Sequence, residues 1–297
     1  MLDSSWLWIV FTLIAAAAQT ARNATQRELT ATLGTVGATH VRFLFGFPFS
    51  AIFLLIVMLA TGAALPVPTL SYWPWLALGA FGQIAATALM LAAMNDRSFV
   101  VIYAYIKTEP VPVALFGLVF LGDKLTPAMA VAIAVATVGV VLMGLKPGTK
   151  TDVRATLLGI AAGAMFGLSA VSYRGAILNL ELPNYVVAAT FTLAVGLAVQ
   201  AGALTIYLWL RDPGVLGAIV RAWRPSLFAG FLGALASQFW FLAFAVAAVA
   251  SVRTLALVEV LFAQGVSRFV FKQATTPREL LGIVLIVIGV VLLIWTQ

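Results

Sequence analysis

The chain repeats one unit at a spacing of 150 residues. Tyr105–Pro127 reads YIKTEPVPVALFGLVFLGDKLTP and Leu255–Pro277 reads LALVEVLFAQGVSRFVFKQATTP, so the stretches align without a gap and Glu109 falls on Glu259. The same shift places Thr126 and Pro127 on Thr276 and Pro277, and Gly139–Leu142 on Gly289–Leu292. Because the shift is half of a 297-residue chain, the sequence predicts two copies of one unit, each with a carboxylate inside an apolar segment.

Composition restricts the chain to the membrane. Hydrophobic residues make up 63% and charged residues 9%, against about 45–50% and about 25% in soluble domains. Long apolar segments favour spanning helices over an outer-membrane barrel. The net charge of +7 is then typical of a cytoplasmic face, and nucleic-acid binding is not expected. With no cysteine, a single histidine (His40) and no phosphate-binding or hydrolase motif, we expect no metal, no cofactor and no enzymatic activity.

Ten spanning helices are predicted, because each needs about 20 mostly apolar residues. The windows are Ser5–Ala21, Val36–Ala60, Tyr72–Met94, Phe99–Leu121, Pro127–Leu145, Ala155–Tyr173, Tyr185–Leu210, Ser226–Val246, Ser251–Phe271 and Pro277–Trp295. A linker at Lys146-Pro147-Gly148 separates a first five-helix repeat, 1–147, from a second, 148–297. An odd number of spans obliges the second copy to enter the membrane upside down, so we expect an all-α bundle of inverted repeats around a central cavity.

Basic residues are distributed unevenly over the predicted loops. One face, with the adjoining helix ends, holds thirteen: Arg22, Arg27, Arg42, Arg97, Lys146, Lys150, Arg154, Arg211, Arg221, Arg224, Arg268, Lys272 and Arg278. The opposite face holds Lys124, Arg174 and Arg253. The bias predicts a bacterial inner-membrane protein with both termini in the periplasm.

Charged residues inside the predicted spans are the first candidates for function. Lys107 and Glu109 lie in the fourth helix, two positions and therefore about 200° apart, so different partners are expected. Pro110 follows and disrupts the turn. Glu109 and Glu259 serve either gating and proton coupling or a structural role, such as pairing with Arg253. Lys107 is either an anion-binding group in the cavity or a member of a fixed ion pair.

Uncharged polar and aromatic residues complete the candidate set. Gln83 in the third helix and Gln238 in the eighth occupy similar positions in the two copies, and Gln19 lies in the first helix. They either line the cavity, offering donors and acceptors without charge, or make hydrogen bonds between helices. Four aromatic residues near these positions are substrate contacts or ordinary packing: Tyr103, Tyr105, Tyr173 and Trp240.

Three further patterns indicate how the helices are built. Thr126 and Thr276 precede prolines and are predicted N-caps, and Glu279 completes a capping box with Thr276. A close-packing face on the sixth helix is predicted from glycines spaced by four: Gly159, Gly163 and Gly167. Tryptophans at predicted helix ends are typical of interfacial belts: Trp6, Trp8, Trp73, Trp75, Trp209, Trp223 and Trp295.

The chain resembles EamA-type members of the drug/metabolite transporter superfamily. The resemblance rests on the proline-kinked fourth helix with its GDKLTP exit and the Gly-Val-Val-Leu ending of the fifth, and it extends over both halves. The second copy departs from the pattern, because Val260 and Leu261 stand where the kink proline is expected. The resemblance implies alternating access without enzymatic activity, and within the superfamily the chain is most similar to YddG-type aromatic amino acid exporters.

Together these features predict a secondary transporter that exports small metabolites, with amino acids, especially aromatic ones, as the expected substrates. Export of drugs, sugars or phosphorylated metabolites by the same fold is the nearest alternative. A passive facilitator and an intramembrane enzyme acting on lipids are the other classes. The expected partners are the substrate and the bilayer, with the chain either a monomer or a homodimer.

Overall fold

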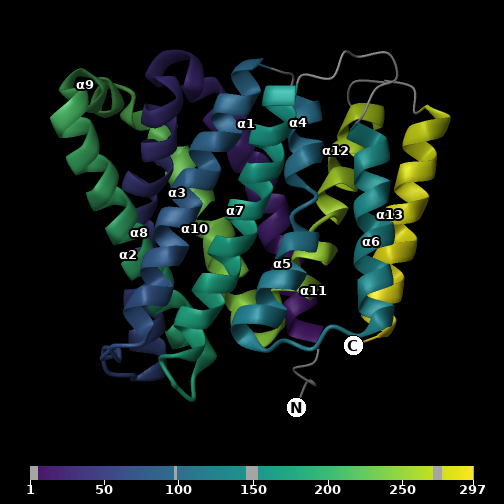
Figure 1. The fold of residues 1–297 in the computed structure, drawn as a ribbon. Helices are drawn as coiled ribbons and strands as arrows, with labels where there is room; N and C mark the ends of the chain where they lie inside the picture. The colour runs from purple at the N-terminus through teal and green to yellow at the C-terminus, as the bar shows by residue number, and fades with distance from the viewer. Residues whose placement is uncertain (1–5, 97–98, 145–152, 270–275, 297) are drawn as a thin grey trace. The chain divides into compact units, whose positions relative to one another are not determined.

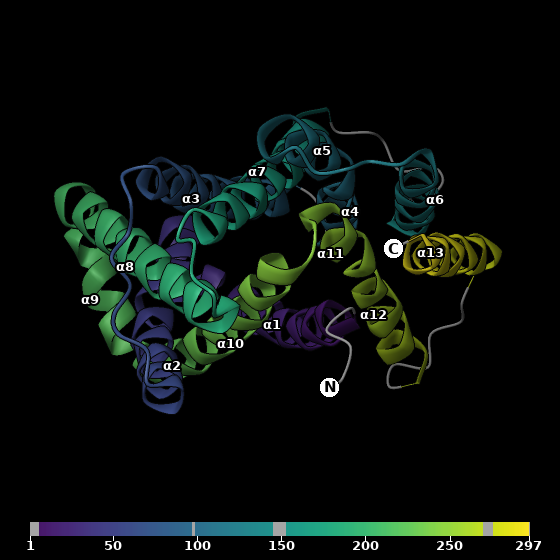
Figure 2. The ribbon, with the colours of Figure 1, turned by 90° about the horizontal axis from the view of Figure 1, so that it is seen from below.

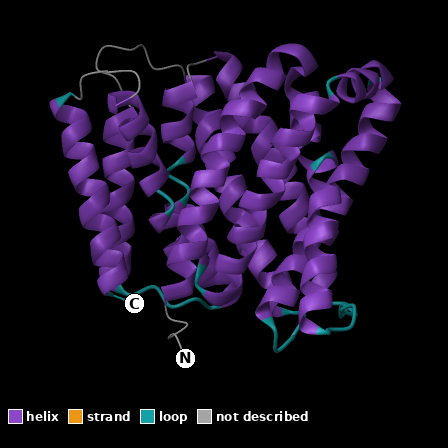
Figure 3. Ribbon diagram, turned by 180° about the vertical axis from the view of Figure 1, so that it is seen from behind, coloured by secondary structure: helices purple, strands orange, loops and turns teal. Residues whose placement is uncertain are grey.

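The computed structural model describes residues 6–96, 99–144, 153–269 and 276–296, and every regular element among them is helical (Figures 1 and 3). The elements are α1 (Leu7–Leu44), α2 (Gly46–Thr61), α3 (Tyr72–Asp96), α4 (Phe99–Ile106), α5 (Pro110–Phe116), the π-helical turn η2 (Gly117–Leu121), α6 (Pro127–Gly144), α7 (Val153–Leu178), α8 (Tyr185–Arg211), α9 (Pro213–Arg221), α10 (Trp223–Val246), α11 (Val249–Leu255), α12 (Val258–Phe269) and α13 (Pro277–Trp295).

The all-helical, multi-pass membrane class is confirmed. Within the described residues, seven helical stretches are long and apolar enough to cross a membrane, and Leu7–Arg22 and Pro127–Met143 are shorter apolar helices. In the described part of the chain, each predicted window falls mostly on helix. The predicted linker at 146–148 and the ends of the fifth and ninth windows lie outside the described residues.

Gly34 separates the first two predicted helices. α1 covers the first window and the start of the second, but Gly34 has φ 68° and ψ 179°, which is not helical. Only glycine adopts such a positive φ without strain. The end of α1 therefore continues into α2, and together they form the first candidate span, Thr32–Thr61.

The helices form two compact units, which differ from the two sequence repeats. Unit one consists of Met1–Ile84 and Ser172–Val246, and unit two of Ala85–Val171 and Ala247–Gln297. The boundaries therefore fall inside α3 and α7. Each unit takes helices from both halves of the sequence, so neither is one repeat folded on itself.

Unit one is built on α10, which packs along α1 and also contacts α2 and α8 (Figure 2). The short helix α9, between α8 and α10, is absent from the sequence prediction. It contacts α1 and α8. Its nine residues are too few for a spanning window.

Unit two pairs α6 with α13 through glycines (Figure 1). A Cβ placed on Gly139 would lie 2.7 Å from the Gly282 carbonyl oxygen, and one on Gly289 would lie 2.8 Å from the Ala132 carbonyl oxygen. The two contacts are equivalent under the 150-residue repeat, because Gly139 corresponds to Gly289 and Ala132 corresponds to Gly282. Such reciprocity is expected when two copies are related by a two-fold axis.

The predicted N-caps are confirmed. The Thr126 hydroxyl accepts a hydrogen bond from the Met129 backbone N–H at 3.2 Å. Thr276 and Glu279 form a complete capping box at the start of α13. Each cap fixes the first turn of one helix of the α6–α13 pair.

We predict that Gly139→Ala and Gly289→Ala each destabilise the protein by about 1–3 kcal/mol, because the new methyl groups meet backbone atoms that cannot rotate away. Thermal unfolding in detergent measures the effect. Gly202→Ala is the matched control, since nothing lies within 4 Å of its added Cβ. Equal melting temperatures for all three variants would contradict the close pairing.

Candidate functional site

The fourth predicted helix is broken at Lys107–Glu109, between α4 and α5. Pro110 has no N–H to offer the Ile106 carbonyl, which instead accepts a hydrogen bond from the Glu109 N–H at 3.0 Å. Likewise the Thr108 carbonyl accepts from Val111 at 3.1 Å. Tight i to i+3 bonds thus satisfy the Ile106 and Thr108 carbonyls, which would otherwise lack a donor because of the prolines.

The ninth predicted helix is broken in the same register, between α11 and α12. The Glu259 N–H donates to the Ala256 carbonyl at 3.1 Å, which is the Glu109 bond shifted by 150 residues. No proline causes this break, since Val260 and Leu261 follow Glu259. The two copies are therefore broken at matched positions, although only the first has a proline there.

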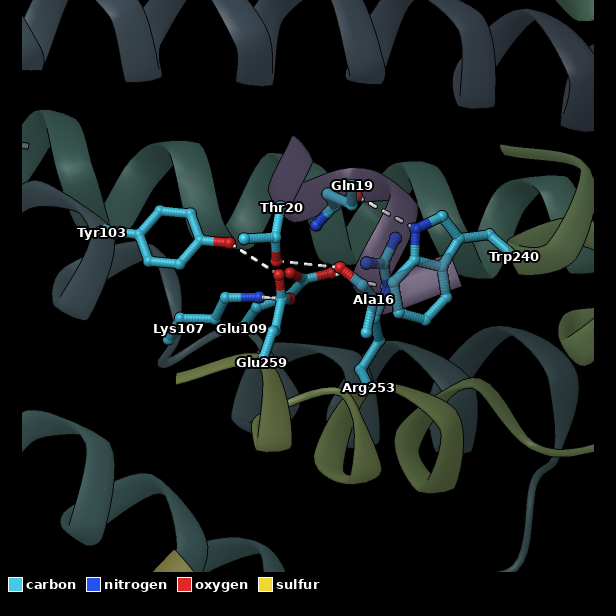
Figure 4. A network of polar contacts seen from close by, with 9 residues as sticks. All are labelled: Ala16, Gln19, Thr20, Tyr103, Lys107, Glu109, Trp240, Arg253 and Glu259. Atoms are coloured by element: carbon cyan, nitrogen blue, oxygen red, sulfur yellow. Dashed lines mark hydrogen bonds and ion pairs between the residues drawn. The ribbon is translucent and has the colours of Figure 1, made fainter. Parts of the chain in front are cut away.

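Two ion pairs cross between the broken helices (Figure 4). The Lys107 ammonium on the first contacts the Glu259 carboxylate on the second. The Arg253 Nε of α11 lies 3.0 Å from Glu109 Oε1 at the start of α5. Tyr103 donates its hydroxyl to Glu259 Oε2 at 2.8 Å, and the Lys107 Nζ lies 4.9 Å from the centroid of the Tyr103 ring. Different partners for Lys107 and Glu109, as the sequence predicts, are confirmed.

The contacts of this cluster are reciprocal under the repeat. Tyr103 and Arg253 occupy equivalent positions, as do Glu109 and Glu259. Each donor reaches the carboxylate of the other copy: Tyr103 bonds Glu259, and Arg253 pairs with Glu109. Lys107 breaks the symmetry, because Leu257 occupies the equivalent position.

Ion pairing lowers the free-energy cost of burying these four charges in apolar surroundings. Each of the four charged residues is no more than 9% exposed. Two carboxylates face two cations, so the formal charges cancel. A buried charge left without its partner costs several kcal/mol, whereas a paired and hydrogen-bonded one costs far less.

The glycine ladder of α7 packs behind the first break, as predicted for a close-packing face. A Cβ added to Gly159 would lie 2.9 Å from the Tyr105 Cβ. One added to Gly163 would lie 2.8 Å from the Ile106 carbonyl oxygen, and one added to Gly167 would lie 2.8 Å from the Val113 Cγ2. Candidate Tyr105 therefore lies against α7, and Pro110, five residues further along the chain, is buried.

Unit one brings together two other candidates. The Trp240 indole N–H donates to the Gln19 Oε1 at 3.0 Å (Figure 4). Candidate Tyr173 is fully buried, with its ring centroid 4.6 Å from that of Phe241. These residues belong to a packed aromatic group that includes the polar contact between Trp240 and Gln19.

The matched glutamines bond α8 at two separate points. Gln83 accepts a hydrogen bond from the Gln200 Nε2 at 2.9 Å, and Gln238 donates to the Thr190 hydroxyl at 2.7 Å. Thr190 and Gln200 lie ten residues apart on one helix, which is about 15 Å along its axis. Both glutamines therefore make hydrogen bonds between helices, at different depths of unit one.

Several buried polar residues escape sequence reasoning. Arg22 and Arg42 are counted with the loop charges, yet their side chains are buried and their stems lie 3.4 Å and 3.6 Å from the Cβ position of Gly233. His40 is buried and hydrogen bonds with Thr205 at 3.0 Å. Trp8 is buried rather than interfacial. Arg42, His40 and Trp8 lie inside predicted apolar windows, and that position could have indicated their burial from the sequence alone.

Comparison with known proteins finds a family model that matches somewhat less than half of the chain. Residues 6–145 match the EamA-like transporter family. This match indicates a membrane transporter of small molecules rather than an enzyme, and it does not distinguish the aromatic amino acid exporters within the family. Among curated proteins none matches the chain. A solved structure, described only as the crystal structure of a protein, is similar over 99% of this chain and 99% of its own, with a TM-score of 0.70 and 17% identity, which shows the shared fold.

We predict that Lys107→Met destabilises the protein by about 3–5 kcal/mol, because it leaves the Glu259 charge buried without its ammonium partner. Lys107→Met combined with Glu259→Gln should recover most of the loss, since no unpaired charge remains. Thermal unfolding in detergent measures the cycle, with the exposed Lys124→Met as control. A double variant as unstable as the sum of the single variants would contradict the pairing.

Proposed function

We propose that the chain is a secondary active transporter that exports small metabolites across the bacterial inner membrane by alternating access. In this proposal ten spans form two inverted five-helix repeats, 1–147 and 148–297, with both termini in the periplasm. The family match of the first half and the reciprocal contacts between equivalent residues support it. So does the basic bias of one set of loops.

The proposal rests on two ion pairs, Lys107–Glu259 and Arg253–Glu109, which connect the two helices at their matched breaks. Charges buried in spanning segments mark transport pathways. A pair that holds two broken helices together in one state must be released or exchanged when those helices move. Glu109, Pro110, Arg253 and Glu259 are the proposed gating or coupling residues.

The charge balance of the cluster favours zwitterionic substrates. An amino acid carries one ammonium and one carboxylate. Its ammonium can pair with Glu259 while its carboxylate pairs with Lys107, so the Lys107–Glu259 ion pair can open without leaving any charge unpaired. A substrate with one sign of charge cannot do so. Aromatic amino acids suit the aromatic residues near the candidate positions. The proposed substrate-binding residues are Gln19, Gln83, Tyr103, Tyr105, Lys107, Tyr173, Gln238 and Trp240.

We predict saturable counterflow of amino acids in proteoliposomes, fastest for aromatic ones. Vesicles loaded with unlabelled amino acid should take up the labelled compound faster than empty vesicles. Glu109→Gln and Glu259→Gln should each slow exchange at least about tenfold, which corresponds to 1.4 kcal/mol in the barrier. Lys124→Met should exchange like wild type.

Each other outcome selects another function. Saturating uptake without acceleration by internal substrate indicates a passive facilitator. Exchange of sugars, phosphorylated metabolites or drugs but not amino acids overturns the substrate class and keeps the transporter. Well-folded protein that exchanges none of these, and loses a lipid product on Glu109→Gln, indicates an enzyme.

We predict that Gln83→Ala and Gln238→Ala each raise the KM for exchange about two- to tenfold, the loss of one neutral hydrogen bond. Gln200→Ala is the matched control, because it removes the Gln83 partner and keeps the candidate residue. If Gln83 serves only packing, Gln83→Ala and Gln200→Ala will lower the melting temperature equally and leave KM unchanged. That result would remove Gln83 from the binding site.

A further inference from the structure

The segment around α9 carries three arginines among exposed apolar residues. Arg211, Arg221 and Arg224 are exposed, and Asp212 is the one acidic residue between them. Large apolar side chains beside them are at least half exposed: Tyr207, Trp209, Leu210, Val220 and Trp223. The ion pairs recorded in the described part of the chain do not involve these arginines. The segment therefore presents positive charge and apolar surface together.

α9 is held firmly by one face. Its Val215 Cγ1 would lie 2.9 Å from a Cβ on Gly37 of α1, and Ile219 is fully buried. Val220 and Arg221 on other sides of the helix stay exposed. A nine-residue helix with such separated faces lies along a surface and keeps its arginines in place.

A groove of about 470 Å³ runs beside this helix. Its walls come from α1, α9 and the start of α10: Leu29, Thr32, Leu33, Ala218, Arg221, Ala222 and Pro225. The volume lies in the range of small-molecule sites, about 300–1,000 Å³. Apart from the Arg221 guanidinium and the Thr32 hydroxyl, the walls are apolar. The lining suits a ligand with one anionic end and a hydrocarbon body.

Helix length places the segment at the membrane surface. α8 has 27 residues and is about 40 Å long, against about 30 Å for the hydrocarbon core. This excess length leaves room for its last residues, among them Trp209 and Arg211, to extend beyond the core. Tryptophan and arginine side chains are both favoured at that depth. Basic residues next to a spanning helix attract anionic lipids.

We propose that the groove between α1 and α9 binds an anionic phospholipid. Arg221 receives the headgroup phosphate, Arg211 and Arg224 add positive charge around it, and an acyl chain follows the walls formed by Leu29 and Leu33. Arg224 is braced by the Trp223 ring, whose centroid lies 5.4 Å from its guanidinium carbon. Free phosphate would leave the apolar walls and exposed aromatic residues uncovered, so the ligand is a lipid.

Native mass spectrometry of the purified full chain tests the site. The protein is incubated with phosphatidylglycerol or with phosphatidylcholine of the same acyl chains, and retained lipid is counted. Wild type should retain phosphatidylglycerol in preference. Arg221→Gln/Arg224→Gln should weaken retention about fivefold per arginine. Ala218→Phe should lower retention as well, because its ring fills the groove.

Controls separate a site from general attraction. Arg154→Gln removes an exposed arginine of α7, outside the groove, and should leave retention unchanged. Equal retention of both lipids, or a double variant that retains phosphatidylglycerol like wild type, would overturn the proposal. So would an equal loss in Arg154→Gln, or displacement of the lipid by inorganic phosphate alone. Each variant should keep the wild-type melting temperature in phosphatidylcholine.

Discussion

The cost of burying a charge governs the architecture of unit two. Glu109 and Glu259 lie in apolar surroundings, where an unpaired carboxylate costs several kcal/mol. Each finds its cation on the other broken helix, so neither helix satisfies its own charges. The two broken helices are therefore bound to each other more specifically than apolar packing alone would achieve, because hydrocarbon contacts tolerate sliding and ion pairs do not.

The same demand explains why two different sequences break a helix at one register. In the first copy, Pro110 removes an N–H and forces the tighter turn. In the second copy no proline acts, yet Glu259 closes the same i to i+3 bond. The carboxylate common to both copies, which must meet a donor on the partner helix, is the shared determinant. The break in the second copy forms without a proline.

Much of the fold follows from local sequence, and the site follows only in part. Apolar windows and the Thr126 and Thr276 caps depend on residues close in sequence, and the α7 glycines are recognisable from their spacing, so a single sequence reveals them. The 150-residue shift also singles out the two glutamates. Their partners are tertiary: nothing local tells that Lys107 meets Glu259 while Arg253 meets Glu109. The nine residues of α9 escape because their stability comes from packing against α1 and α8.

Unit one relies on a different kind of polar contact, arranged along α8. Thr190, Gln200 and Thr205 bond side chains of α10, α3 and α1 respectively, and carboxylates take no part in these bonds. Neutral hydrogen bonds between membrane helices are worth about 0.6–2 kcal/mol each, and losing one leaves no bare charge. A helix tied at three depths in this way resists tilting relative to its neighbours. Unit two concentrates its buried charges at two breaks, where exchanging one partner changes the charge balance of the whole cluster. The contrast between the neutral contacts of α8 and the crossed ion pairs fits the proposed carrier, in which one set of contacts would brace the helices and the other would respond to substrate.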